Sequence, residues 1–195
     1  MSALRRREVV RALLVNRGDL LVVAGLGSTA WDCAATGDHP LTFPMWGGMG
    51  CAAVTGLGLA LAQPARRVLV VTGDGEMLMG LGSLATIGVQ RPANLSVVVI
   101  DNERYGETGM QKTHTAHGVD LAAMARAAGF ASAVLVREAS AIESLRQAVH
   151  HGAGPHFAQV KVVAEKEAIT LPPREGTLLK NRFREALLGA SASLQ

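Results

Sequence analysis

Short apolar runs alternate along the chain with segments whose apolar residues recur at helical spacing. We expect strands at residues 20–24, 68–72, 96–100, 133–136 and 157–163. Helical spacing predicts helices near residues 4–16, 49–62, 77–89, 119–128, 139–150 and 176–189. Strands that alternate with helices are typical of an α/β protein, so we expect a three-layer α/β/α fold with a mostly parallel sheet.

The composition agrees with one buried sheet. Hydrophobic residues make up 49% of the 195 residues and charged ones 18%, which excludes a disordered chain and suits a sheet buried on both faces. We expect residues 1–195 to form a single domain, because no linker or internal repeat interrupts the pattern. Pro172 and Pro173 precede the last helix, so residues 166–195 are expected to form a C-terminal extension with a helix.

Charge and cysteine content narrow the class of partner. The net charge of +3 is mild and the basic residues are scattered, so we expect no nucleic-acid binding. No apolar stretch free of Gly, Pro and charge is long enough to span a bilayer, and the N-terminus lacks the apolar segment of a signal peptide. Cys33 and Cys51 give no disulfide framework and are expected to be buried packing residues. We therefore expect a cytoplasmic protein with no membrane contact.

Two oxygen-bearing side chains directly follow two neighbouring predicted strands. Asp74, within Gly73-Asp74-Gly75, comes after the strand at 68–72, and Asn102 comes after the next strand along the chain. One helical crossover joins these strands, so both side chains are expected at the carboxyl edge of the sheet, where ligands bind in open α/β folds. Carboxylate and amide oxygens are ligands for Mg²⁺ or Ca²⁺ rather than for zinc.

The residues after Asp74 favour an anion beside such a metal. The backbone N–H groups of Gly75 and Glu76 open the next helix, whose dipole attracts negative charge. The motif therefore predicts a site for a magnesium–diphosphate ligand. A hairpin turn at Asp74-Gly75 and a simple turn at Asn102 are the structural alternatives. The helical spacing of residues 76–89 disfavours the hairpin.

The spacing from Gly73-Asp74-Gly75 to Asn102 resembles the signature of thiamine-diphosphate enzymes. The resemblance implies that Asp74 and Asn102 bind the metal through side-chain oxygens and that the backbone carbonyl of Arg104 is the third protein ligand. Asp101 stands where many members of the family carry a first Asn.

The upstream stretch FPMWGGMGCAAVTGLGLAL (43–61) is similar to the family's glycine turn before a helix. In the family this turn meets the aminopyrimidine ring of the cofactor. The resemblance implies that the turn at Gly47 and Gly48 contributes a carbonyl, from Gly47, to the exocyclic amine. It also implies that Met49 is the apolar wedge that bends the cofactor, although a methionine at this position is also a common core residue.

The stretch NERYGETGMQKT (102–113) resembles a loop of sulfopyruvate and phosphonopyruvate decarboxylases. There a Tyr-Gly-x-Thr-Gly-x-Gln-x-Thr pattern follows the metal-binding Asn. The resemblance implies that the segment formed by Tyr105, Gly106, Glu107 and Thr108 closes over the diphosphate. Glu107 departs from the small residue that this pattern leads us to expect.

The family resemblance also implies a partner. Thiamine-diphosphate enzymes use a second domain that supplies a glutamate to the pyrimidine ring, and this chain has length for the diphosphate-binding half alone. We therefore expect a partner subunit with the pyrimidine-binding domain, in a heterodimer or heterotetramer. The expected reaction is decarboxylation of a small 2-oxo acid by the bound thiamine diphosphate. The alternatives are a carboligase subunit, similar to acetolactate synthase, and a non-catalytic cofactor-binding subunit.

Two further features invite other interpretations. The stretch AGLGSTA (24–30) fits the GxGxxA fingerprint of nicotinamide dehydrogenases, but residues 39–73 contain no acid to hold a ribose. We therefore expect Gly27 and Ser28 to form a loop at the same carboxyl edge. His114 and His117 follow the diphosphate loop, and we expect them in a mobile polar segment without a catalytic role.

Overall fold

Six parallel strands form the central sheet of the computed structural model, which describes residues 3–194. The strand order is β2-β1-β3-β4-β8-β7. The strands are β1 (Leu21–Ala24), β2 (Thr42–Pro44), β3 (Val68–Gly73), β4 (Leu95–Asp101), β7 (Ser132–Val136) and β8 (His156–Lys161). All pairs in this sheet are parallel, as the alternation of apolar runs and helical segments predicts.

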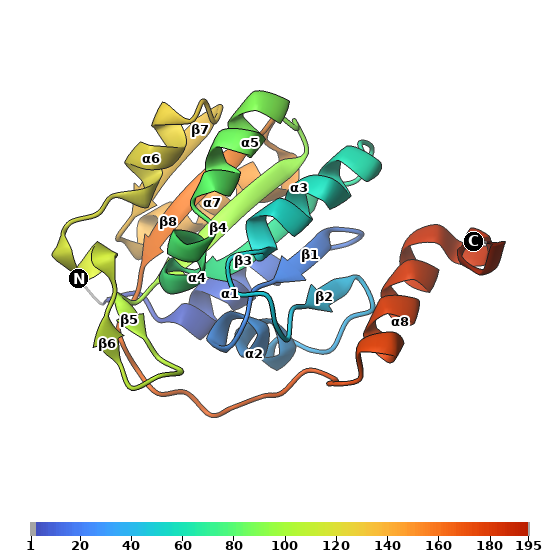
Figure 1. Cartoon of the computed structure of the whole chain (residues 1–195), viewed down its shortest axis with the longest axis horizontal. Coiled ribbons are helices and arrows are strands. Elements are labelled where there is room, and N and C mark those ends of the chain that lie inside the picture. The colour runs from blue at the N-terminus through green and yellow to red at the C-terminus, as the bar shows by residue number, and fades with distance from the viewer. Residues whose placement is uncertain (1–2, 195) are drawn as a thin grey trace.

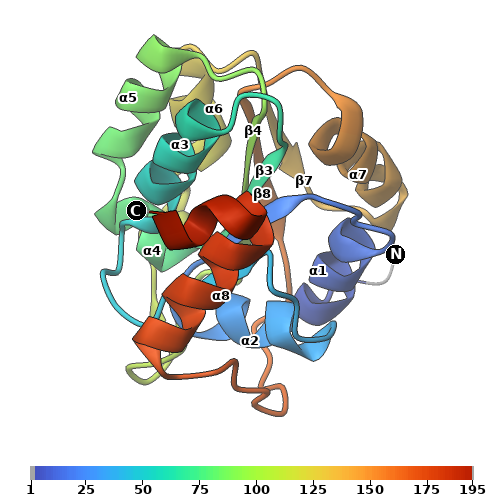
Figure 2. The same ribbon diagram turned by 90° about the vertical axis from the view of Figure 1, so that its right-hand side faces the viewer.

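Helices cover both faces of the sheet, which makes a three-layer α/β/α fold (Figures 1 and 2). One face packs against α1 (Arg6–Leu14), α2 (Ser28–Ala35) and α7 (Ile142–His151). The other face packs against α3 (Ala52–Ala62), α4 (Asp74–Met79), α5 (Gly82–Gln90) and α6 (Leu121–Ala127). Alternate strand residues feed the two cores, because successive side chains of a strand point to opposite faces. In β3, Leu69 and Val71 join the first core and Val70 the second.

The C-terminal helix α8 (Gly176–Leu188) lies against the edge of the sheet at β2 (Figure 1). Its Phe183 ring meets Phe43 edge-on at a centroid distance of 5.7 Å. The indole N–H of Trp46 donates to the Pro173 carbonyl at 2.7 Å. These contacts cover the exposed edge of β2, and the helix predicted at 176–189 is confirmed. The treatment of residues 166–195 as an extension stays a prediction.

Several local predictions were wrong. The helix predicted at 77–89 is divided into α4 and α5, because Gly80 approaches Gly50 so closely that a Cβ at Gly80 would overlap the Gly50 carbonyl oxygen. Helix α2, strand β2 and a hairpin formed by β5 (Arg104–Tyr105) and β6 (Gln111–Lys112) had not been predicted.

Cys51 and the histidine segment also differ from expectation. Cys33 is buried, as predicted, but Cys51, which directly precedes α3, is exposed. His114 and His117 belong to the 3₁₀ helix η1 (His114–His117), not to an irregular loop.

None of the helices within residues 3–194 is both long and apolar enough to span a membrane. The cytoplasmic location stays a prediction.

The strand order creates a switch point between β1 and β3. From β1 the chain moves first to β2 on one side and then back to β3 on the other side. The segments after β1 and β3 therefore diverge to opposite faces, to α2 and α4, and leave room for a ligand between them at the carboxyl edge.

Candidate cofactor-binding site

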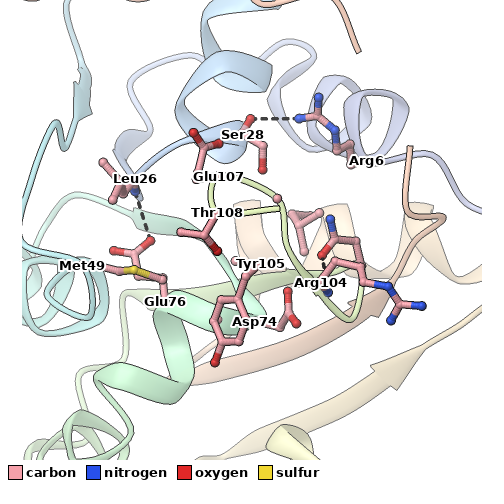
Figure 3. A pocket seen from close by; sticks show the side chains of 15 residues that line it. Arg6, Leu26, Ser28, Met49, Asp74, Glu76, Arg104, Tyr105, Glu107 and Thr108 are labelled. Atoms are coloured by element: carbon pink, nitrogen blue, oxygen red, sulfur yellow. Dashed lines mark hydrogen bonds between the residues drawn. The ribbon is translucent and has the colours of Figure 1, made fainter. Parts of the chain in front are cut away.

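A cavity of about 210 Å³ opens at the carboxyl ends of β1, β3 and β4, at this switch point (Figure 3). Its lining residues are Arg6, Leu26, Ser28, Met49, Gly73, Asp74, Gly75, Glu76, Ile100, Asn102, Arg104, Tyr105, Gly106, Glu107 and Thr108. Ten of them are in the predicted set of twelve cofactor-binding residues, and Arg104 was predicted as a metal ligand. The register of β3 and β4 explains this convergence, since Gly73 pairs with Ile100 and the next residues on both strands emerge together.

Asp74 begins α4 and is only 2% exposed. Its Oδ2 accepts a hydrogen bond from the Thr113 hydroxyl, and the Thr115 hydroxyl oxygen lies 3.3 Å from the same atom. No other residue that the structure describes donates to Oδ1, and no Lys, Arg or His of the described chain forms an ion pair with this carboxylate. Burial raises the pKa of Asp74 to about 6; the Thr113 hydrogen bond opposes this shift, while the nearby Asp101 carboxylate adds to it.

Asn102 and Arg104 approach the same cavity from the end of β4. The Asn102 Oδ1 accepts from the Arg104 backbone N–H at 2.9 Å, which makes a tight turn around Glu103 with a positive φ of 61°. An amide oxygen has two lone pairs, so the turn leaves one acceptor position on Asn102 free. Asp74, Asn102 and Arg104 thus provide a carboxylate, an amide and a peptide group at one edge of the sheet.

The β5–β6 hairpin forms the outer wall of the cavity. Tyr105 packs against Gly75, where an added Cβ would lie 2.5 Å from the tyrosine Cε1. Glu107 reaches toward the loop after β1, with its Oε1 2.8 Å from where a Cβ on Gly27 would stand. Figure 3 shows Glu107 beside Ser28, and Tyr105 between Met49 and Asp74. The predicted segment 105–108 therefore lines the cavity, and its closure over a diphosphate stays a prediction.

Glu76 is a second buried acid in the cavity wall, at 4% exposure. Its Oε2 accepts from the Thr72 hydroxyl at 2.8 Å and from the Leu26 backbone N–H at 3.1 Å, while Oε1 is buried without a hydrogen-bond partner within residues 3–194. Burial raises the pKa of Glu76, and the Thr72 and Leu26 hydrogen bonds partly oppose that shift. The side chain links α4 to the β1–α2 loop.

Some predicted residues lie outside the cavity, and others were missed. Gly47 and Gly48 are exposed on the turn before Met49 and do not line the cavity. His114 and His117 do not line it either. Arg6, Leu26, Ser28 and Ile100 line it but were not predicted as site residues. Only the AGLGSTA loop carried a signal, and its predicted place at this edge is confirmed by Leu26 and Ser28. Thr113 and Thr115 were also missed.

The fold is shared with a decarboxylase of known structure. Benzoylformate decarboxylase from Polynucleobacter necessarius superimposes on 84% of this chain with a TM-score of 0.66 and 20% identity, and the match covers 34% of that chain. At this identity the likeness shows the fold alone.

Sequence comparison defines the family. Residues 27–160 match the thiamine pyrophosphate enzyme C-terminal TPP-binding domain. The chain is 37% identical over 188 residues to sulfopyruvate decarboxylase subunit beta of Methanothermobacter thermautotrophicus, covering 96% of this chain and 98% of the relative. It is 46% identical over 112 residues to phosphonopyruvate decarboxylase of Streptomyces viridochromogenes, covering 57% and 28%. The chain belongs to the thiamine pyrophosphate enzyme family, as its resemblance predicted.

Proposed function

We propose that this chain is the diphosphate-binding subunit of a thiamine-diphosphate-dependent 2-oxo acid decarboxylase. The observation that carries the proposal is the convergence of Asp74, Asn102 and Arg104 on one cavity of the family's fold. The full-length similarity to a sulfopyruvate decarboxylase beta subunit supports the two-subunit form. The similarity to a phosphonopyruvate decarboxylase supports a substrate with a second anionic group.

The donor set fits a hard divalent cation. Asp74 and Asn102 would bind Mg²⁺, or Ca²⁺, through side-chain oxygens and Arg104 through its carbonyl. The fit is supported by the Asp74 carboxylate, which is buried, lacks a cationic partner within residues 3–194 and keeps one oxygen free of other residues. Within the described chain no group of three His, Cys, Asp or Glu side chains is placed to hold a metal. A metal bound here would therefore take part of its coordination from the diphosphate and water.

The remaining predicted residues would hold the cofactor. Gly73, Gly75 and the backbone of Glu76 would meet the diphosphate at the start of α4, with the segment 105–108 as its cover. Gly47, Gly48 and Met49 would meet the pyrimidine end. Bound thiamine diphosphate supplies an electron sink for the bond that breaks when carbon dioxide leaves. The chain's own residues bind, orient and shield it.

Exposed apolar residues on α3 and at the end of α4 support a partner subunit. Helix α3 contains one polar residue, Thr55, and is apolar on every face. Val54 and Leu61 on this helix are 44% and 49% exposed, and Met79 at the end of α4 is 63% exposed. Helices that are apolar all round are normally covered, so a pyrimidine-binding subunit that packs here would bury this surface and close the cavity.

Calorimetry with thiamine diphosphate tests the cofactor proposal. We expect saturable binding in the presence of Mg²⁺ or Ca²⁺ and weak binding in EDTA, because the diphosphate otherwise meets the Asp74 carboxylate without a cation between them. NAD serves as the matched control ligand, since it also carries a diphosphate. Binding of NAD but not of thiamine diphosphate would contradict the proposal.

Reconstitution tests the reaction. The chain should be co-purified with a pyrimidine-binding subunit and assayed for carbon dioxide release from sulfopyruvate, phosphonopyruvate and pyruvate. We expect turnover of at least one 2-oxo acid by the complex and none by the isolated chain. Condensation without net aldehyde release would favour a carboligase, and cofactor binding without any turnover would favour a non-catalytic subunit. Turnover by the isolated chain would show that no partner glutamate is needed.

A further inference from the structure

Two buried threonines reach under the proposed metal ligand from the segment after the β5–β6 hairpin. Thr113 is completely buried and Thr115 is 4% exposed. The Thr113 hydroxyl donates to Asp74 Oδ2, and the two threonine hydroxyl oxygens lie 3.0 Å apart. The Thr115 hydroxyl lies 2.7 Å from Asp101 Oδ1 and 3.3 Å from Asp74 Oδ2. One side chain thus contacts both neighbouring carboxylates.

The hydroxyl protons can be assigned, because each threonine has one to donate. Thr113 donates to Asp74, and Thr115 donates over the shorter distance to Asp101. Each of the two acids therefore receives one hydroxyl. Asp74 Oδ2 accepts a hydrogen bond from Thr113 and is also in contact with Thr115. The carboxylate cannot rotate without breaking these contacts.

The two acids differ in how their negative charge is balanced. Asp101 Oδ2 lies 2.8 Å from the Lys161 Nζ and accepts from the Gln159 Nε2 at 2.6 Å. Its charge is thus compensated inside the protein. Asp74 forms no ion pair with any residue of the described chain and lines the cavity. Of the two acids, Asp74 has no cationic partner among the described residues, and Asp74 is the one that lines the cavity.

The same threonines join the metal ligand to the cover of the cavity. Thr113 follows β6 directly, and its backbone N–H donates to the Glu103 carbonyl at 3.0 Å. The hairpin with Tyr105 and Thr108 therefore begins beside Asn102 and ends at the residue that holds Asp74. Thr113 therefore contacts both Asp74, through its hydroxyl, and the start of the hairpin, through its backbone N–H.

We propose that Thr113 and Thr115 are positioning residues for the divalent cation. They hold Asp74 so that one oxygen stays directed to the cavity, while Lys161 balances the charge of Asp101 and Gln159 donates a hydrogen bond to it. This inference rests on the proposed function, because the cation is the one expected to accompany the diphosphate. Groups that orient a metal ligand typically change metal affinity by about 10- to 100-fold when they are removed.

The test measures Mg²⁺-dependent binding of thiamine diphosphate to the full chain by calorimetry, with no assay of turnover. Thr113→Val and Thr115→Val keep the shape of the side chain and remove the hydroxyl. We expect each to weaken binding by about 10-fold or more, with the larger loss for Thr113→Val. Thr113→Ser and Thr115→Ser keep the donor and should bind within about 3-fold of the parent. Thr36→Val is the matched control, because it removes a hydroxyl that donates at 2.7 Å to the Cys33 carbonyl outside the cavity.

Apoprotein thermal midpoints, measured in EDTA, separate positioning from folding. Weaker binding by the valine variants at an unchanged midpoint supports the inference, and parent-like binding by both valine variants overturns it. If a valine variant loses its folded state, its serine partner decides: parent-like binding supports the inference, and a 10-fold loss overturns it. Failure of the parent itself to bind Mg²⁺ and thiamine diphosphate would instead contradict the proposed function.

Discussion

Asp32 and Asp101 are both completely buried, yet their surroundings differ in kind. Asp32 lies on α2 and receives two guanidinium groups from α1, with Arg6 at 2.6 Å and Arg7 at 3.1 Å. Both of its oxygens are occupied by cations, and neither is shared with another acid. These ion pairs join α1 to α2 on one face of the sheet.

Asp101 ends β4 and receives one cation, Lys161, from the neighbouring strand β8. Its second oxygen accepts from Thr115 and from the Glu103 backbone N–H. Through Thr115 it is connected to Asp74, which has no cation of its own within residues 3–194. The result is a chain of contacts that ends at a cavity.

The difference teaches how to separate a structural acid from one that belongs to a site. Burial alone does not decide, because Asp32, Asp74 and Asp101 are all buried. What decides is whether the negative charge is compensated by the protein, since an uncompensated buried carboxylate costs stability that a ligand cation can restore. By this criterion Asp32 supports the fold, and Asp74 is the acid that we propose binds a cation.

Replacing Asp74 gives the largest expected effect on binding. Asp74→Ala should abolish Mg²⁺-dependent binding of thiamine diphosphate, because the diphosphate loses the cation that joins it to the protein. Calorimetry at saturating Mg²⁺ measures this loss, with Asp74→Asn as the variant that keeps the shape. Equal affinity of the variant and the parent would show that Asp74 does not take part in cofactor binding.

Replacing Asp32 should give the opposite profile, a loss of stability. Asp32→Asn leaves Arg6 buried without an acid, and breaking a buried pair in this way typically costs about 3–5 kcal/mol. Urea denaturation measures the free energy of unfolding. Glu143→Gln is the control, because its ion pair with Arg146 is on the surface and its loss should change stability far less than the loss of a buried pair. An effect of Asp32→Asn no larger than this control would show that the buried pair is not a structural tie.

The pH dependence of the apoprotein sharpens the same distinction. The folded pKa of Asp74, about 6, is above its unfolded value of 3.8, so the folded state favours the protonated acid. Stability from this group therefore rises as pH falls through 6 toward 4 and is lowest where both states are ionised. Between pH 5 and pH 7 the difference is about 1 kcal/mol. Denaturation of the parent and of Asp74→Asn in EDTA, at both pH values, should show a pH dependence that is larger by this amount in the parent, because the other titrating groups, such as Glu76, are common to both. A parent and variant with the same pH dependence would contradict it.

The sequence predicted the core of the fold because its long apolar runs and helical spacings are strong local signals. Strand β2, with three residues and a proline, is too short to produce an alternating pattern. Helix α2 was missed because STAWDCAA buries Asp32 and Thr29 along with its apolar residues, which hides the usual amphipathic spacing. Its buried acid is explained only by α1, which packs against it.

The site residues that directly follow a strand could be predicted from the sequence. Asp74 and Asn102 follow directly from the strand positions, so their convergence on one cavity is confirmed. Thr113 and Thr115 carry no such signal, because their partners are set by the register of β3 and β4 and by the path of the hairpin. Sequence alone likewise does not tell that Lys161 neutralises Asp101, which requires the pairing of β4 with β8.

Among the three buried acids, the smallest expected effect comes from replacing Asp101, and it tests the comparison with Asp32 most directly. Asp101→Asn keeps an acceptor for Thr115, and Lys161 retains Glu103 as an acidic partner at 2.7 Å. No charge is therefore left without a partner, but the Asn amide NH₂ would face the Lys161 and Gln159 donors. The loss of stability should therefore be about 1–2 kcal/mol, below that of Asp32→Asn. Urea denaturation of both variants under one buffer condition gives the difference. A loss in Asp101→Asn as large as in Asp32→Asn would show that Glu103, which is partly exposed, does not replace the buried acid as a partner for Lys161.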